Sequence, residues 1–389
     1  MKQKTVNILF LLIFLLGLLA ALGRTLLMPK EYNYYENRYA DRVAPLTASA
    51  YLDGSFQDGM ERGLNDQIPG AQKMKKLYHL SFSLYQKLIA EPLAKRLPDR
   101  YVNMGGLRSI NGWLCYYPRW LYLEEGQAAK KAENYNAIFA AHPETEFYLY
   151  NIETDTNVNL ESGERSAPIF EFMQERLTLP AENMANFRID TLEDYTAQFF
   201  RTDHHWNHRG AYRGYTDMLA LIAPDETPLQ PVEEVNLGSF SGTKASGKAL
   251  SLMEEDFVAY RFDFPEMTFE IDGAPGENYC RQEKFFSGEM SGATYGAFNG
   301  DDVGLVHIHT PSQAGKGNLL LIGDSYDNAV IRLLASHFEH TYAVDLRYYS
   351  VFDGGEFYLG EFLEEKEIDR VLISGSFSFF VQDDFLLED

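Results

Sequence analysis

Leu319-Leu320-Leu321-Ile322-Gly323-Asp324-Ser325 is the stretch that decides the fold of this 389-residue chain. Consecutive apolar residues predict a buried strand, and the apolar spacing of residues 328–338 predicts a helix directly after it. This step from strand to helix puts Ser325 at the carboxyl end of a strand, where sites form in open α/β sheets. We expect Gly323 to permit the sharp turn and the helix dipole to favour an oxyanion beside the serine. Taken alone, Asp324 and Ser325 are better explained as a helix cap.

The sequence on either side extends this alternation. Strands are predicted at residues 342–344 and 371–373, with a helix at 357–366 between them. A strand–helix–strand order implies right-handed crossovers and parallel pairing. Upstream, the same signals predict strands at 147–150, 187–190, 257–262 and 267–271 and helices at 71–90, 126–141, 169–177 and 210–223. The predicted fold class is therefore α/β, with a parallel sheet flanked by helices on both faces.

Three segments are predicted along the chain. Residues 1–30 form a signal anchor or transmembrane helix, residues 31–100 a stalk and amino-terminal helical collar, and residues 101–389 the domain that carries the sheet. Within that domain, residues 224–316 are rich in Gly, Ser, Pro and Asp. This composition predicts a Gly/Ser-rich β insertion or a β-rich subdomain.

The amino end carries a targeting or membrane signal. Lys2 and Lys4 precede a leucine-rich run over residues 6–23, as is typical of a secretory signal or a signal anchor. The run is slightly shorter than the roughly 20 residues that a spanning helix prefers, and extending it requires Arg24 to be buried or to snorkel. Because a cleavage site with small residues is not evident, we expect an uncleaved single-pass anchor. The positive-inside rule then puts the rest of the chain outside the cytoplasm.

The charge balance excludes one broad class of partner. Thirty-four Lys and Arg stand against 57 Asp and Glu, a formal net charge of −23. Nucleic-acid binding needs a positive face to displace counterions, so we expect no nucleic-acid partner. The 14% aromatic content suits a sugar-binding surface as well as an ordinary core. Cys115 and Cys280 lack a metal-binding spacing, and the sequence allows either a disulfide or two buried thiols.

A second block of polar residues lies upstream of Ser325 and reads Arg201-Thr202-Asp203-His204-His205-Trp206-Asn207-His208. A serine hydroxyl needs a base, and the base needs a carboxylate that fixes its tautomer. In an extended loop Asp203 and His205 point the same way, so one short segment supplies both. The sequence therefore predicts Ser325 as nucleophile, His205 as base and Asp203 as orienter. Trp206 would either wall the site or pack beneath it.

The same block admits a metal site, with potential ligands at Asp203, His204, His205 and His208. His307 and His309 lie downstream and offer further ligands. The spacing of these residues is not that of a zinc-binding helix, and cysteine contributes nothing. We therefore expect neither a metal nor another cofactor.

The Asp-His-His-Trp tetrad, followed downstream by a strand and Gly-Asp-Ser, resembles the DHHW protein family. That family is similar to the alginate O-acetyltransferases (the AlgJ and AlgX group) of the SGNH hydrolase-like superfamily. Shorter blocks resemble amino-terminal elements of the same group: Glu36-Asn37-Arg38, Leu52-Asp53-Gly54, Asp66-Gln67-Ile68-Pro69-Gly70 and Asn111-Gly112-Trp113-Leu114. The resemblance implies an SGNH-like sheet in permuted order. It also implies the same three roles for Ser325, His205 and Asp203.

The oxyanion hole departs from the ordinary SGNH pattern. The asparagine of a Gly-x-Asn-Asp block is not evident, because the corresponding strand continues as Ser374-Gly375-Ser376. We expect the Ser325 amide to supply one donor. The second is expected from Asn151, from Arg347 or from an amide near Gly375, since each follows a predicted strand.

The resemblance implies an extracytoplasmic polysaccharide O-acetyltransferase that works through an acyl-serine intermediate. Its substrate would be an exported or cell-surface polysaccharide. Because an enzyme outside the membrane lacks acetyl-CoA, the resemblance also implies a multi-pass membrane acyltransferase as partner. A carbohydrate acetylesterase with the same three residues and a non-catalytic polysaccharide-binding scaffold both stay open. In each case we expect a cell-membrane protein with its main domain extracytoplasmic.

Overall fold

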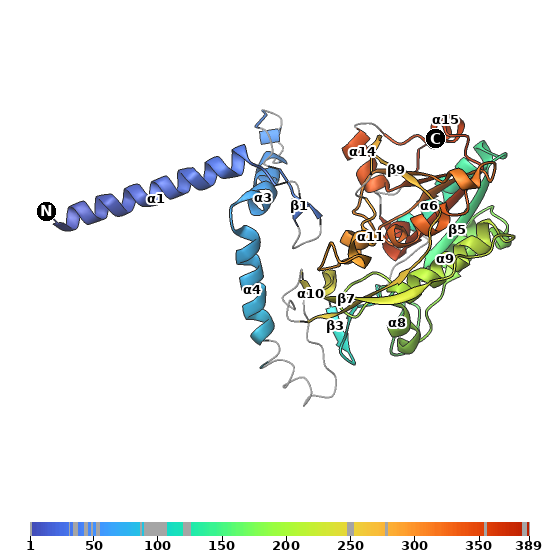
Figure 1. The fold of residues 1–389 in the computed structure, drawn as a ribbon, viewed down its shortest axis with the longest axis horizontal. Coiled ribbons are helices and arrows are strands. Elements are labelled where there is room, and N and C mark those ends of the chain that lie inside the picture. Colours follow the sequence, from blue (N-terminus) through green and yellow to red (C-terminus); the bar gives the residue numbers. More distant parts are fainter. Residues whose placement is uncertain are drawn as a thin grey trace. The chain divides into compact units, whose positions relative to one another are not determined.

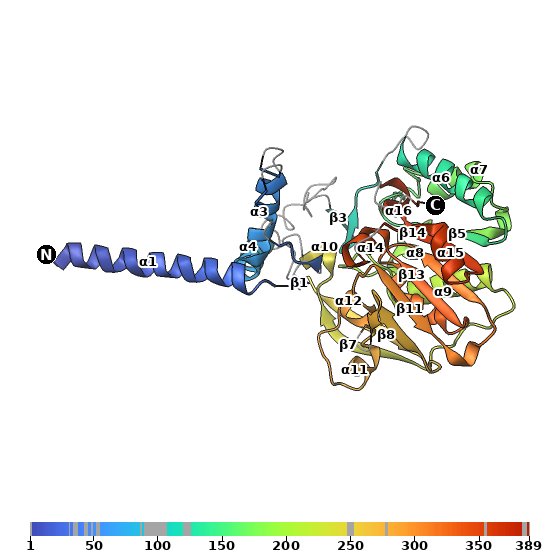
Figure 2. The same ribbon diagram turned by 90° about the horizontal axis from the view of Figure 1, so that it is seen from above.

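The computed structural model describes residues 2–30, 32–33, 38–42, 46–47, 50–51, 55–85, 88, 107–119, 126–246, 253–276, 279–353, 356–382 and 387–388. They belong to two compact units, Met1–Arg100 with Thr243–Met253, and Tyr101–Gly242 with Glu254–Asp389 (Figures 1 and 2). Two of the short blocks quoted above, Glu36-Asn37 and Leu52-Asp53-Gly54, lie outside the described residues.

The first unit begins with one long apolar helix, α1 (Lys2–Leu27), whose apolar side chains are exposed. Its stretch Thr5–Thr25 has a mean hydropathy of 2.7, so α1 is long and apolar enough to span a membrane or to act as a signal sequence. The other described elements of the unit are β1 (Tyr32–Asn33), β2 (Arg38–Tyr39), α3 (Ser55–Gln67), α4 (Ala71–Tyr85) and α10 (Thr243–Ser246). Asp66 and Gln67 at the end of α3 accept the backbone amides of Asp41 (2.9 Å) and Lys30 (2.6 Å).

The second unit is built on an eight-stranded sheet in the order β10-β9-β11-β13-β12-β14-β5-β6. These strands are β5 (Glu146–Ile152), β6 (Met184–Phe187), β9 (Thr268–Ile271), β10 (Ala274–Pro275), β11 (Leu305–His309), β12 (Asn318–Ile322), β13 (His340–Val344) and β14 (Arg370–Ser376). The five strands from β13 to β6 are parallel, whereas β11, β9 and β10 continue the sheet antiparallel. The predicted α/β class is confirmed, with an antiparallel extension that was not predicted.

Alternate residues of β12 enter two separate hydrophobic layers. Leu319 and Leu321 pack with side chains of α8 (Leu192–Gln198), α9 (His208–Ile222) and α13 (Ile331–Ala335). Leu320 and Ile322 pack with side chains of α6 (Gln127–Ala141), α7 (Ile169–Arg176), α15 (Leu359–Glu365) and α16 (Phe377–Val381). Because successive side chains of a strand point to opposite faces, one apolar run fills both layers. Helices accordingly cover both faces of the sheet (Figure 1).

Residues 224–316 divide between two places. β7 (Glu233–Phe240) and β8 (Glu255–Arg261) pair with each other in a separate two-stranded sheet, whereas β9, β10 and β11 join the central one. A further hairpin joins β3 (Leu107–Ile110) to β4 (Trp113–Tyr116). Cys115 in β4 and Cys280 are not joined by a disulfide, and burial raises the pKa of Cys280 to about 12.

Candidate active site

Residues 203–206 lie in the connection between α8 and α9 (residues 199–207), and hydrogen bonds on both sides of this loop fix its path. Before the loop, the Glu255 carboxylate at the start of β8 accepts the amides of Arg201 (2.8 Å) and Thr202 (2.6 Å). After it, Asn207 Oδ1 caps α9 by accepting two amides of its first turn, at 2.9 and 3.1 Å. Charge-assisted and capping hydrogen bonds of this kind restrict the loop to one conformation.

Asp203, His205 and Ser325 form a continuous hydrogen-bonded chain. His205 Nδ1 lies 2.7 Å from Asp203 Oδ1, and His205 Nε2 lies 2.9 Å from Ser325 Oγ. The backbone amide of His205 also donates to Asp203 Oδ1, at 3.0 Å. Asp203 and His205 are buried and Ser325 is half-buried. Residues that are 120 positions apart in sequence are therefore within reach for proton transfer.

The Asp203 carboxyl is strongly biased towards its ionised form. Burial by itself would raise its pKa, but the charge of His205 and hydrogen bonds from it, with His204 adding to them, outweigh burial and hold the pKa well below its usual range. The carboxylate therefore stays ionised where a histidine titrates. An ionised Asp203 keeps the Nδ1 proton on His205 and leaves Nε2 free to accept from Ser325.

Tyr295 and Tyr326 complete the surroundings of His205, and the sequence reasoning missed both. The Tyr295 ring stacks on His205 with centroids 3.7 Å apart and an interplanar angle of 1°. Its hydroxyl lies 2.9 Å from the backbone carbonyl oxygens of both Ser325 and Tyr326 and donates to them. The Tyr326 hydroxyl donates to the His204 carbonyl at 2.6 Å. These two tyrosines therefore tie the loop of the base to the loop of the serine.

The loop that carries Ser325 is held mainly by side chains and not by a long helix. The predicted helix at 328–338 is wrong, because a 3-10 turn, η5 (Asp327–Ala329), is followed only by the five-residue α13. In its place, Asp324 Oδ1 accepts the Tyr326 amide (3.1 Å), and Asp324 Oδ2 accepts the amide (3.1 Å) and hydroxyl (2.8 Å) of Ser376. Asp324 thus connects the loop to the carboxyl end of β14.

Glycine is needed at position 323 because its surroundings leave no space for a side chain. Its backbone φ is not positive, so a left-handed conformation is not the reason. A Cβ at this position would lie 1.7 Å from Asp327 Oδ2 and 2.7 Å from the Ser374 carbonyl oxygen. Asp327 reaches under the loop, where its Oδ1 accepts the Ser374 hydroxyl at 2.8 Å. Burial, and then the charge of Asp324, raises the pKa of Asp327 well above its usual range, which favours a neutral carboxyl there.

The two side chains predicted as second oxyanion donors are both engaged elsewhere. The amide of Asn151, at the end of β5, donates to Asn186 Oδ1 at 2.8 Å. The Arg347 guanidinium, which follows β13, donates through Nε to Asp345 Oδ1 at 2.9 Å. The third candidate, an amide near Gly375, is also occupied, because the Ser376 amide donates to Asp324. The Ser325 amide makes no hydrogen bond to another residue that the structure describes, which leaves it available to an oxyanion.

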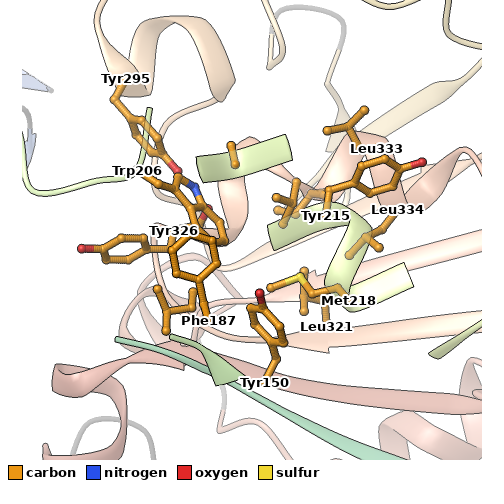
Figure 3. Close-up of a cluster of buried hydrophobic side chains, with 14 of the residues drawn as sticks. Tyr150, Phe187, Trp206, Tyr215, Met218, Tyr295, Leu321, Tyr326, Leu333 and Leu334 are labelled. Atoms are coloured by element: carbon orange, nitrogen blue, oxygen red, sulfur yellow. The ribbon is translucent and has the colours of Figure 1, made fainter. Parts of the chain in front are cut away.

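Trp206 packs beneath the site and does not wall it. The indole is fully buried, with its ring 5.6 Å from those of Phe187 and Tyr326 (Figure 3). Two glycines of α9 make room for it, since a Cβ at Gly214 would lie 2.5 Å from Trp206 Cζ3 and one at Gly210 would lie 2.8 Å from Trp206 Cβ. Trp206 therefore couples the position of α9 to the loop that carries His205.

The geometry of this loop meets only some of the requirements of a metal site. Ligand atoms of Asp203, His204 and His205 lie within 4.8 Å of one another. However, Asp203 Oδ1 and both nitrogens of His205 already serve the chain to Ser325. His208 lies apart from this group, with Nε2 3.4 Å from Glu234 Oε2. His307 and His309 lie on β11 and not in the loop.

Comparison with known proteins finds a family model that matches part of this chain. A family model described as "DHHW protein" matches residues 182–344, which include both the loop with Asp203 and the strand that leads to Ser325. No curated protein matches the sequence.

Several solved structures are similar in fold. A DHHW family protein from Eubacterium siraeum is 20% identical with a TM-score of 0.56, and the alignment covers 73% of this chain and 96% of that one. PatB1 of Bacillus cereus with a sulfonyl adduct is 18% identical with a TM-score of 0.55, covering 73% and 97%. AlgX of Pseudomonas aeruginosa is 14% identical, covering 75% and 66%, and its TM-score of 0.38 carries no structural argument. At these identities the first two likenesses establish the fold. The resemblance read from the Asp-His-His-Trp tetrad is thereby confirmed: residues 182–344 carry the pattern of the DHHW protein family.

Proposed function

We propose that this protein is an extracytoplasmic polysaccharide O-acetyltransferase that works through an acyl-serine at Ser325. The observation that carries the proposal is the hydrogen-bonded chain from Asp203 through His205 to Ser325 Oγ, at 2.7 and 2.9 Å. The fold relative PatB1, which carries a sulfonyl adduct, supports it, because sulfonyl groups form adducts with nucleophilic side chains.

The chemistry follows from these contacts. Ser325 Oγ attacks the acyl carbonyl carbon while His205 Nε2 takes the hydroxyl proton, and that proton then passes to the leaving group of the donor. The amide of Ser325 donates to the oxyanion. A sugar hydroxyl next loses its proton to His205 Nε2 and attacks the acyl-serine, which releases the acylated sugar and restores the Ser325 hydroxyl. The acyl donor would come from a multi-pass membrane acyltransferase, the partner that the family resemblance implies.

The same three residues would support an acetylesterase, in which water takes the place of the sugar hydroxyl. Both reactions pass through the same acyl-serine, and they differ only in the acceptor of the second step. We favour transfer because of the resemblance to the alginate O-acetyltransferases.

The triad is tested with the full chain in detergent and p-nitrophenyl acetate as donor. Ser325→Ala should lower the rate of p-nitrophenol release about 1,000-fold or more. Ser287→Ala, which removes a hydroxyl from a loop outside the site, should leave the rate unchanged. Near-ultraviolet circular dichroism checks that both variants fold. Equal rates in the wild type and Ser325→Ala would refute the triad.

The acceptor is tested by adding a neutral hexose oligomer to the same reaction. A transferase gives acetylated oligomer, detected by mass spectrometry, and the product should disappear in Ser325→Ala. If acetate is the only product with every oligomer tested, the protein is an esterase and the proposed transferase activity is refuted.

A further inference from the structure

Three histidines and two glutamates form a cluster at one face of the central sheet, and the proposed reaction uses none of them. His307 and His309 lie on β11, His340 begins β13, Glu270 lies on β9, and Glu339 directly precedes β13. In the strand registers His309 is opposite His340, and His307 is opposite Glu270. Because residues that are opposite or two apart share a face, the three imidazoles and the Glu270 carboxylate meet on one side.

Hydrogen bonds within the cluster fix the tautomers of two of its histidines. Glu270 Oε2 lies 3.0 Å from His307 Nδ1, and His307 Nε2 lies 3.0 Å from His340 Nδ1. Because the carboxylate can only accept, His307 donates through Nδ1 and accepts at Nε2, so His340 donates through Nδ1. The lone pair of His340 is then on Nε2. A histidine held through its other nitrogen by such a relay is the usual arrangement around a metal ligand.

The free nitrogen of His340 has two further ligand groups beside it. One ligand atom each from His309, Glu339 and His340 lies within 4.8 Å of the other two. The rings of His309 and His340 are 4.6 Å apart at 16°, and Glu339 Oε1 is 4.0 Å from His340 Nε2. Ligands of a tetrahedral zinc ion are roughly 3.4 Å apart, given bonds of about 2.1 Å. Small side-chain rotations therefore bring all three into one coordination sphere.

We propose that this cluster is a binding site for a divalent transition-metal ion of the zinc class. His309, His340 and Glu339 are the ligands, and the Glu270–His307 pair positions His340. Two imidazoles and one carboxylate suit borderline ions such as Zn²⁺ or Co²⁺ better than Mg²⁺ or Ca²⁺, which prefer oxygen ligands.

The charges around the cluster are compatible with a bound cation. Lys366 is a positive charge that acts on Glu270. It forms an ion pair with Glu365 at 2.7 Å, which reduces its repulsion of a bound cation. The side chains of His307, His340 and Glu339 are 20 to 32% exposed, so an ion can enter from solvent.

The site is separate from Ser325. His340 and the serine lie towards opposite ends of the strands, because Val344 at the far end of β13 is level with Ile322, the last residue of β12. Four residues of strand correspond to about 13 Å. The ion would therefore join β11 to β13 without taking part in the acyl transfer.

The site is tested with the full chain in detergent, stripped by chelation and titrated with ZnCl₂ in a calorimeter. We expect one saturable site in the wild type and at least about 10-fold weaker binding in His309→Ala and in His340→Ala. His142→Ala removes a histidine beside another glutamate, Glu144, and should bind as the wild type does. His205→Ala should also retain the site, which separates it from the metal alternative in the loop.

Cobalt provides a second measurement that does not depend on folding stability. Co²⁺ bound by the three ligands and water should give the strong visible absorption of a tetrahedral site, and His307→Gln should shift these bands and weaken binding about 10-fold. Absence of saturable zinc binding would overturn the proposal. Zinc binding that is lost in His205→Ala but unchanged in His309→Ala would overturn it equally.

Discussion

His205 is held by two neighbouring rings and by a hydrogen bond at its edge. Tyr295 lies flat against one side at 3.7 Å, and the His204 ring lies 3.8 Å from it at an angle of 37°. Asp203 holds the edge of the His205 ring through its hydrogen bond with His205 Nδ1. A base confined in this way has little orientational freedom left to lose in the transition state, which favours proton transfer. Tyr295 is therefore a positioning residue for the proposed reaction.

Tyr295→Phe keeps the stacked ring but removes the hydroxyl that donates to the carbonyl oxygens of Ser325 and Tyr326. A buried acceptor that loses its donor costs about 1–3 kcal/mol. Because one of these acceptors is the backbone carbonyl of Ser325, we expect the serine to be held less firmly in position. We expect kcat for p-nitrophenyl acetate to fall about 10- to 100-fold with KM nearly unchanged.

Tyr212→Phe is the matched control, because it removes a tyrosine hydroxyl from the neighbouring aromatic cluster around Tyr260 and Phe262. It should leave kcat unchanged. A Tyr295→Phe variant with wild-type kcat, or with a loss that appears only in KM, would contradict a positioning role.

The sequence predicted the three residues of the hydrogen-bonded chain because each is part of a short motif with its own chemical logic. It did not predict Tyr295, which begins α12 (Tyr295–Asn299) in a loop-rich segment without a periodic pattern. Nor did it locate a second oxyanion donor. Asn151 and Arg347 do follow strands as predicted, but Asn186 and Asp345 take their donors, and pairing between side chains of distant segments leaves no local signal.

At the scale of elements, α9 and the loop of His205 are joined by the indole of Trp206. Gly210 and Gly214 are one turn apart on α9 and allow the ring to approach the helix backbone. The helix cannot move away from or towards the sheet without moving Trp206, the residue next to the base. Small residues on α9 thus contribute to the geometry of a site that they do not touch.

Gly214→Ala tests this coupling. In the interior of a helix this change usually raises stability by about 1 kcal/mol. Here the added methyl would lie 2.5 Å from Trp206 Cζ3, so we expect the free energy of unfolding to fall by about 1–3 kcal/mol. Chemical denaturation followed by fluorescence measures it.

In a Trp206→Phe background, the overlapping atoms of the indole are absent and the same change should become neutral or stabilising. An equal cost of Gly214→Ala in both backgrounds would show that Trp206 is not the cause.

The elements that the sequence predicted best are those with an unbroken run of apolar residues. β12 and β14 are buried on both faces, so their unbroken apolar runs located them to within a few residues. β11 alternates Val306 and Ile308 with His307 and His309, and its place beside β13 depends on a pairing that no local pattern reveals. The helix after Ser325 was wrong because Asp327 turns inwards to Ser374, which breaks the helix that its apolar spacing predicted.

At the scale of the whole molecule, α1 is the described element that is long and apolar enough to place the protein at a membrane. Its apolar stretch of 21 residues can anchor the chain, as we propose, or direct its export. A charge at the middle of a spanning helix costs about 2.5–3.5 kcal/mol on insertion scales, whereas one near the basic end costs less. Leu15→Arg should therefore reduce the fraction of the chain that resists extraction by alkaline carbonate.

Thr5→Arg, next to Lys4, is the control and should remain in the membrane fraction. Mass spectrometry of the purified chain distinguishes the two roles of α1. A mature chain that starts after α1 would contradict an uncleaved anchor.

The order of strands has a consequence for how this protein folds while it is synthesised. β14 lies between β12 and β5, so it joins the part of the sheet that leads to Ser325 to the edge formed by β5 and β6. It is also the last strand that the structure describes. A chain that emerges amino-terminus first therefore exposes two unpaired strand edges, on β5 and later on β12, until β14 arrives. Until β14 is synthesised, these unpaired edges favour aggregation, so the yield of folded protein should depend on chaperones that cover strand edges.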